Sequence, residues 1–97
     1  MIHALKTDPA VFQDALDGKK PWEMRPDDRR YEIGDTLRLE ETRHSAEEMK
    51  AGAPLQFTGR KLTVRVIYIL RGPVYGLQEG WCVMSTEPHK EDDHDHK

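Results

Sequence analysis

Apolar and polar side chains alternate along three stretches of the chain, a fourth stretch is a short apolar run, and each of the four predicts a β-strand. A period of two is typical of a strand that turns one face to the core and the other to solvent. The predicted strands cover residues 2–7, 36–42, 61–71 and 81–85. The clearest is 61–71, in which one parity is apolar throughout: Leu62, Val64, Val66, Tyr68 and Leu70.

A helix is predicted directly after the first strand. Pro9 follows Asp8; a proline at the first helical position loses no hydrogen bond, and we expect the Asp8 carboxylate to cap the free amides. Gly18 supplies the left-handed residue that ends many helices, so the helix covers about 9–17. Its apolar stripe has helical spacing: Val11, Phe12, Ala15 and Leu16.

Residues 43–56 have no strand pattern. Ser45 and Glu48 form a capping box that predicts one helical turn, and Gly52 and Pro54 then break it. We expect a mobile insertion with a short helical turn between two strands.

These elements amount to one main helix, four or five strands and no repeated helix–strand unit. The sequence therefore predicts an α+β fold, built on a small antiparallel, barrel-like sheet. Its 97 residues suffice for one domain, which we place at 1–88. Residues 89–97 are charged and lack apolar side chains, so we expect a disordered, solubilising tail.

The formal net charge is −3, but two segments reverse this sign. Residues 18–30 hold five cations against three acids, for +2, and residues 60–71 hold four cations and no acid, for +4. If the fold places the two segments side by side, they form a basic patch.

Cys82 is the single cysteine, and its apolar neighbours indicate a buried thiol in a reducing compartment. The longest apolar run, 66–70, is too short to span a membrane, and no leader pattern opens the chain. We expect a soluble, cytoplasmic protein with no cofactor. We also expect no metal site, because the histidines of the tail lack preorganised geometry.

The segment 18–25 concentrates charges of both signs beside an aromatic residue. On a strand that begins at Trp22, Glu23 and Arg25 share one face, while Trp22 and Met24 share the other. We therefore expect Trp22 in the core, and a site on the ionic face with Lys20 nearby. The alternative is an exposed strand whose charges only keep it soluble.

This segment resembles the hallmark Gly-x-Lys-x-x-Glu-x-Arg of the ASCH superfamily of PUA-like small β-barrels, at Gly18, Lys20, Glu23 and Arg25. The chain is also similar, over residues 2–86, to a short branch of unknown function in bacteria and phages. The further positions that carry this resemblance are His3, Leu5, Lys6, Phe12, Lys19, Trp22, Asp28, Arg29, Tyr31, Gly34, Asp35, Thr58, Gly59, Gly80, Trp81, Val83 and Met84.

The resemblance implies a cleft between barrel and helix and a domain that binds RNA or a nucleotide. Lys20, Glu23 and Arg25 project into this cleft, and Arg29 adds positive charge. We regard Tyr31 and Tyr75 as candidates for stacking on a base. The complete set of predicted binding residues is Lys6, Lys20, Glu23, Arg25, Asp28, Arg29 and Tyr31.

Two other functions remain open. The first is a hydrolase for a modified nucleoside or RNA, with Lys20 and Glu23 as acid and base; related amidohydrolases carry a threonine nucleophile where this chain has Glu23, and a carboxylate does not replace that hydroxyl. The second is a phage effector that binds a host protein through the basic strand face and residues 43–56. We expect a monomer, since no residue selects a dimer through the edge of the long strand.

Overall fold

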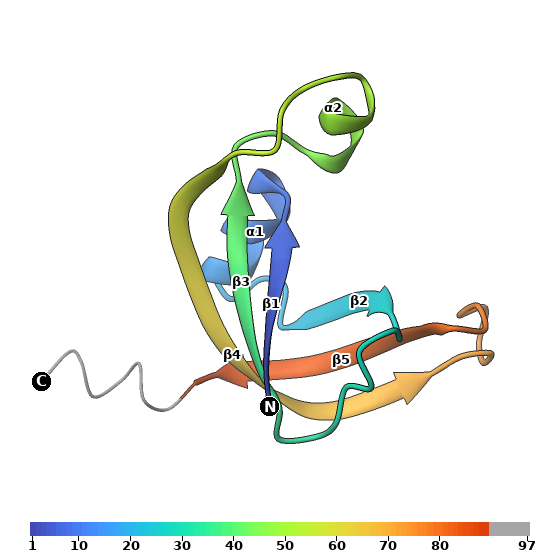
Figure 1. Cartoon of the computed structure of the whole chain (residues 1–97). Helices are drawn as coiled ribbons and strands as arrows, with labels where there is room; N and C mark the ends of the chain where they lie inside the picture. The colour runs from blue at the N-terminus through green and yellow to red at the C-terminus, as the bar shows by residue number, and fades with distance from the viewer. Residues whose placement is uncertain (90–97) are drawn as a thin grey trace, which may run out of the picture.

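A computed structural model describes residues 1–89 of the chain, and it shows a small α+β fold (Figure 1). Five strands form one curled sheet in the order β1-β3-β4-β5-β2, and two helices accompany it. The elements are β1 (Ile2–Thr7), α1 (Pro9–Leu16), β2 (Trp22–Pro26), β3 (Thr36–Thr42), α2 (Ala46–Lys50), β4 (Phe57–Arg71) and β5 (Trp81–Pro88). The tail expected to be disordered is 89–97, and all of it except His89 lies outside the described residues.

The sheet is mixed, so the prediction of an antiparallel sheet is wrong for one pair of strands. β1 runs parallel to β3, whereas β3, β4, β5 and β2 pair antiparallel. Parallel neighbours need a long crossover connection. Here α1 and β2 both lie between β1 and β3 in the sequence and form this connection. The chain then enters β3 beside β1, the strand at the edge of the sheet.

β4 curls the sheet into a half-barrel because its two halves pair with different strands. Its N-terminal part pairs with β3, and its C-terminal part pairs with β5 (Figure 1). The register with β5 shifts between Val66 and Tyr68, which marks a β-bulge. The prediction that even-numbered residues of this strand face the core therefore holds only up to Val66. Beyond the bulge Ile69 packs against the core, while Tyr68 is 58% exposed.

The core fills the concave side of the half-barrel, where α1 contributes the buried Phe12. Cys82 is fully buried there, as predicted, and burial raises the pKa of its thiol. The buried apolar set is Leu5, Phe12, Tyr31, Leu37, Leu39, Val64, Val66, Cys82 and Met84.

The helix ends follow the sequence signals in part. The capping box of α2 is confirmed, with Ser45 and Glu48 bonded reciprocally. The expected cap of α1 is wrong: Asp8 makes no side-chain hydrogen bond to that helix, and its carboxylate instead accepts from the backbone amide of Ala46, 3.1 Å away. Asp8 thus ties the start of α2 to the start of α1.

Within residues 1–89, no helix is both long and apolar enough to cross a membrane.

Candidate functional site

The charged segment leaves α1 through a tight turn at its C-terminal end. Gly18 has φ +78°, a left-handed conformation that glycine adopts without strain. The amides of Lys19 and Lys20 then bond back to the carbonyl of Asp14, at 2.9 and 3.2 Å. This turn places Lys20 beside the first residues of β2.

The ionic face of β2 points inward, and its apolar face points outward. Glu23 pairs with Met84 of β5 and is 2% exposed, whereas Trp22 is 44% exposed and Met24 51% exposed. The predicted alternation is confirmed, but the expectation that Trp22 lies in the core is wrong. A period of two separates two faces without indicating which one is buried.

Glu23 is held by two cations inside the half-barrel. Lys20 Nζ lies 2.5 Å from Glu23 Oε2, while Arg25 Nη2 and Nε lie 2.9 and 3.1 Å from Glu23 Oε1. Both carboxylate oxygens therefore accept charge-assisted hydrogen bonds. The three side chains carry a net charge of +1 in the ionised state, so the cluster can attract an anion.

Arginine side chains also bridge the gap between the edge strands β1 and β2. Arg25 Nη1 donates to the carbonyl of Lys6 at 3.1 Å, and Arg29 Nη1 donates to the carbonyl of Ala4 at 2.8 Å. We call this gap the seam. It is closed by side chains where a full barrel would have a strand pair.

An open groove of about 290 Å³ runs along the seam beside α1. The Lys20 ammonium lies 4.9 Å from the centre of the Trp22 ring at its wall, within the range of a cation–π contact. The lining combines cations, acids and apolar groups: Lys6, Thr7, Asp8, Val11, Lys20, Trp22, Glu23, Met24 and Arg25.

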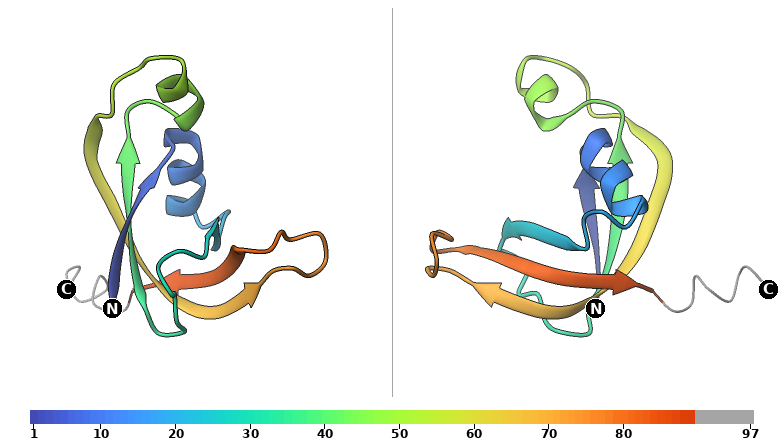
Figure 2. Two further views of the ribbon diagram at one scale, coloured as in Figure 1. Left: turned by 45° about the vertical axis from the view of Figure 1, so that its right-hand side comes forward. Right: turned by 180° about the vertical axis from the view of Figure 1, so that it is seen from behind.

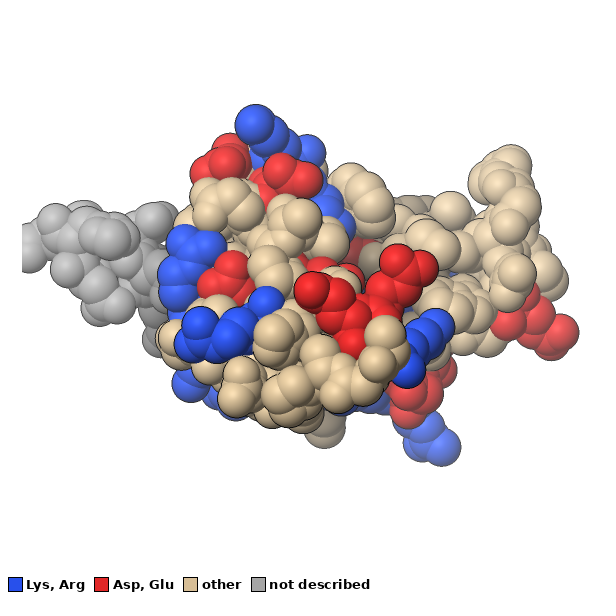
Figure 3. All heavy atoms as spheres, turned by 90° about the horizontal axis from the view of Figure 1, so that it is seen from above, with Lys and Arg blue, Asp and Glu red and all other residues tan. Residues whose placement is uncertain are grey.

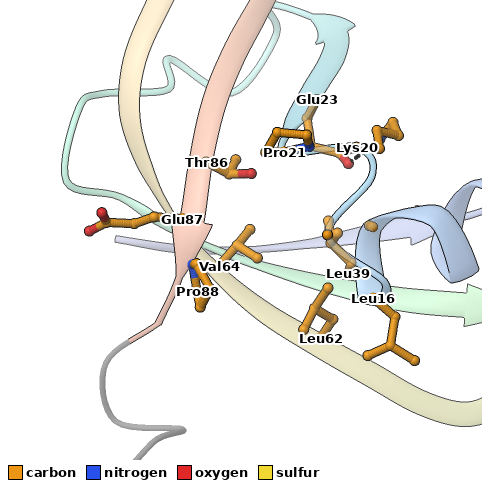
Figure 4. A pocket seen from close by; sticks show the side chains of 12 residues that line it. Leu16, Lys20, Pro21, Glu23, Leu39, Leu62, Val64, Thr86, Glu87 and Pro88 are labelled. Carbon is orange, nitrogen blue, oxygen red and sulfur yellow. Dashed lines mark hydrogen bonds and ion pairs between the residues drawn. The ribbon is translucent and has the colours of Figure 1, made fainter.

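A second, mostly apolar cavity of about 130 Å³ adjoins the same ionic pair (Figure 4). Leu16, Leu39, Leu62 and Val64 line it, and the Thr86 side chain also borders it. Lys20 and Glu23 line both cavities, so they form the wall between the groove and this cavity.

Other predicted site residues lie elsewhere. Tyr31 is 1% exposed and its ring meets His3 edge-on at 4.8 Å, so it is a core residue and its prediction as a base-stacking residue is wrong. Burial raises the pKa of its hydroxyl. Asp28 is exposed and lines neither cavity, and Arg29 is engaged at the seam. Tyr75 is 92% exposed in the loop between β4 and β5.

The expected basic patch does not form, because β5 separates β4 from β2 and each cation of residues 60–71 has an acidic partner. On the face seen from above, acidic and basic groups are interspersed (Figure 3). The ion pairs are Arg60 with Glu41, Lys61 with Glu40, Arg65 with Glu87 and Arg71 with Asp27.

Sequence reasoning missed Trp22 and Met24 as groove residues. The signal was present in the direct adjacency of Trp22 to the Lys20–Glu23 motif, but strand parity alone assigned it to the core. In residues 1–89, no group of three or more His, Cys, Asp or Glu is placed to hold a metal ion.

The fold and the groove define a small mixed α+β half-barrel with an ion-paired cluster at its open seam. The chain belongs to the family described as "Domain of unknown function (DUF3850)", whose pattern matches residues 2–86. It is also similar to the "Uncharacterized 12.9 kDa protein in GpA 3'region" of Escherichia phage P2, with 40% identity over 65 residues. That match covers 67% of this chain and 50% of the phage protein, so the chain spans about half the length of this curated relative.

Proposed function

We propose that this chain binds RNA or a nucleotide in the groove at the seam, with Lys20 as the anion-binding group and Trp22 as the stacking surface. One observation carries the proposal: the Lys20 ammonium contacts both the Glu23 carboxylate, at 2.5 Å, and the Trp22 ring, whose centre is 4.9 Å away. An ammonium has three donors, and Glu23 takes one of them. The others can reach a phosphate oxygen or a base carbonyl in the groove.

Trp22 provides the apolar surface that such a ligand needs. Its side chain is 44% exposed at the groove wall, and an exposed indole can stack on any base. The groove volume of about 290 Å³ lies near the lower end of the range for small-molecule sites. This size suits a single nucleotide unit.

Glu23 and Arg25 serve in this proposal as positioning residues. Glu23 fixes Lys20, and Arg25 fixes Glu23 while its guanidinium also bonds to β1. Lys6, Lys20 and Arg25 stand against Asp8 and Glu23 in the groove lining, for a net charge of +1. Such a groove neutralises about one phosphate. The logarithm of the binding constant should therefore fall with the logarithm of the salt concentration, with a slope of roughly −1.

The same residues support a second element of the proposal, that the half-barrel is PUA-like and of the ASCH kind. The complete Gly18-x-Lys20-x-x-Glu23-x-Arg25 spacing supports it, together with the side-chain contacts among Lys20, Glu23 and Arg25. The resemblance implies the ligand class proposed here, and the chemistry of the groove supports it.

We place binding ahead of hydrolysis because Glu23 has no free oxygen. A general base must reach the proton that it removes, yet both Glu23 oxygens accept from cations and the residue is 2% exposed. Turnover of a modified nucleoside that is lost in Glu23→Gln, with binding retained, would favour the enzyme. Capture of a host protein that is insensitive to Lys20→Ala would favour the effector.

The test is a titration of the purified chain with short single-stranded RNA, duplex RNA, DNA and free nucleotides. Lys20→Ala should lower the affinity at least tenfold, whereas Lys19→Ala, its exposed neighbour outside the groove, should leave it unchanged. Equal affinities of the two variants would overturn the proposal.

A further inference from the structure

The outside of the half-barrel has an apolar face of its own. Residues directly paired across neighbouring strands point to the same side of a sheet. The pairing of β2 with β5, and of β5 with β4, therefore gathers one set of side chains opposite to the core. We call this set the outer face: Trp22, Met24, Pro26, Trp81, Val83, Tyr68 and Leu70, with the polar Ser85 paired to both Trp22 and Tyr68.

The outer face is open to solvent in the part of the chain that the structure describes. Tyr68, Met24 and Trp22 are 58%, 51% and 44% exposed. α1 packs against β3 on the concave side, and in the view from behind no helix crosses in front of β5 (Figure 2). One tryptophan, a tyrosine and a methionine exposed together on one sheet, with the partly buried Trp81 beside them, mark an interaction surface.

The charges bordering the outer face favour a protein partner over nucleic acid. Arg65 and Glu87 lie opposite each other on β4 and β5 and form an ion pair, with side chains 44% and 34% exposed. This pair neutralises itself, so it provides no net positive charge for a phosphate backbone. The surface is mostly apolar at its centre, where Ser85 is the polar neighbour of Trp22 and Tyr68, and it is balanced in charge at this edge.

We propose that the outer face is the interface of a symmetric dimer of this chain. In a two-fold interface the same patch meets itself, and an apolar patch with self-neutralised charge offers no repulsion to its own copy. The sequence led us to expect a monomer, because no residue selects a dimer through the edge of the long strand. It did not indicate that Trp22 and Met24 face outward from β2, or that β4 has a bulge before Tyr68. Both features turn aromatic side chains outward.

The area of the outer face supports a concentration-dependent dimer. Aromatic side chains bury about 150–250 Å² each when fully covered, so a half-exposed one leaves on the order of 100 Å² in solvent. Three half-exposed side chains and three partly buried ones then expose on the order of 400 Å², and two copies remove roughly 800 Å² from water, the size of a weak, transient interface. Dissociation is expected in the micromolar range.

The chain carries its own probe for the test, because both of its tryptophans lie on the outer face. Sedimentation of the full chain at about 1–200 µM should show a monomer–dimer equilibrium. Tryptophan emission should shift to longer wavelength on dilution over the same range. A monomer at every concentration would overturn the proposal, and so would a dimer whose emission does not change when it dissociates.

The matched variants are Tyr68→Lys on the outer face and Leu55→Lys outside it. Both wild-type side chains are about half exposed, at 58% and 49%, so both variants should fold, and circular dichroism checks this. Tyr68→Lys should weaken the dimer at least tenfold, while Leu55→Lys should not. Trp22 and Met24 belong to both the groove and the outer face, so the dimer covers the proposed stacking surface and competes with nucleotide binding. Tyr68 lines neither cavity, so its variant tests the dimer alone.

Discussion

Arg25 and Lys6 are joined across the seam by a hydrogen bond of 3.1 Å from the guanidinium Nη1 to the backbone carbonyl. The same guanidinium donates to Glu23 at 2.9 and 3.1 Å. One side chain therefore connects the two edge strands and fixes the carboxylate that holds Lys20. The architecture of the site and the closure of the half-barrel depend on the same residue.

Arg25→Ala should consequently destabilise the whole fold. The change removes the contact to β1 and leaves the buried Glu23 with one cationic partner instead of two, and we expect a loss of about 2 kcal/mol in the free energy of unfolding. Urea denaturation measures it. The control is Arg43→Ala, at an exposed position outside the sheet, which should change the stability by less than about 0.5 kcal/mol.

This role also affects the design of binding experiments. An Arg25 variant that fails to bind ligand could fail because the seam has opened. Lys20 is the better probe, because its side chain reaches Glu23 and Trp22 but bridges no two strands across the seam.

Trp22→Ala should weaken nucleotide binding by about 5- to 100-fold, the usual value of one base–aromatic stack. The side chain is half exposed, so the fold should survive its loss. Tyr75→Ala is the control, since Tyr75 is 92% exposed and lines neither cavity. Comparable losses in the two variants would remove Trp22 from the site. Both variants are measured at a concentration where the chain is monomeric.

Gly72→Ala should be among the most destabilising single changes. A Cβ at this position would lie 2.0 Å from the backbone oxygen of Gln78 and 2.8 Å from that of Leu77, and backbone cannot move aside as a flexible side chain can. We expect a loss of about 2 kcal/mol or more. The midpoint of thermal unfolding measures it, and an unchanged midpoint would show that the loop between β4 and β5 rearranges freely.

The stability should decline in acid partly through Glu41. Hydrogen bonds from Arg60 and Thr58 hold the pKa of Glu41 below its ordinary value of 4.5. A carboxyl with a depressed pKa in the folded state stabilises the protein above about pH 4.5 and loses this contribution as the pH falls through its folded pKa. Glu41→Gln should therefore unfold more easily at pH 7 but show a smaller loss between pH 5 and 3, as measured by urea denaturation. An identical pH dependence in both proteins would contradict this cause.

Local patterns in the sequence predicted the elements well and their arrangement less well. The strands 2–7 and 36–42 and the helix predicted at 9–17 match the structure nearly to the residue, since periodicity and end signals are local. The parallel pairing of β1 with β3 was missed because pairing depends on the long crossover between them. The bulge before Tyr68 was missed because it adds one residue without interrupting the apolar run.

At the site, too, local neighbours were predicted correctly and exposure to solvent was not. The motif spacing correctly brought Lys20, Glu23 and Arg25 together, because residues two and three apart on a turn and strand are neighbours whatever the fold. It misjudged Trp22 and Tyr31, whose exposure depends on which side of the sheet receives the core. The basic patch predicted from the charge of 60–71 was also wrong, because these cations form ion pairs with acids from distant segments, such as Arg71 with Asp27.

Whether the groove at the seam binds a nucleotide is decided by titrating wild type, Lys20→Ala and Lys19→Ala with a mononucleotide and a short single-stranded RNA at two salt concentrations. We predict saturable binding that falls with a log–log salt slope of about −1, is reduced at least tenfold in Lys20→Ala and is unaffected in Lys19→Ala. The absence of binding to both ligands, or equal binding by the two variants, would contradict the proposed groove.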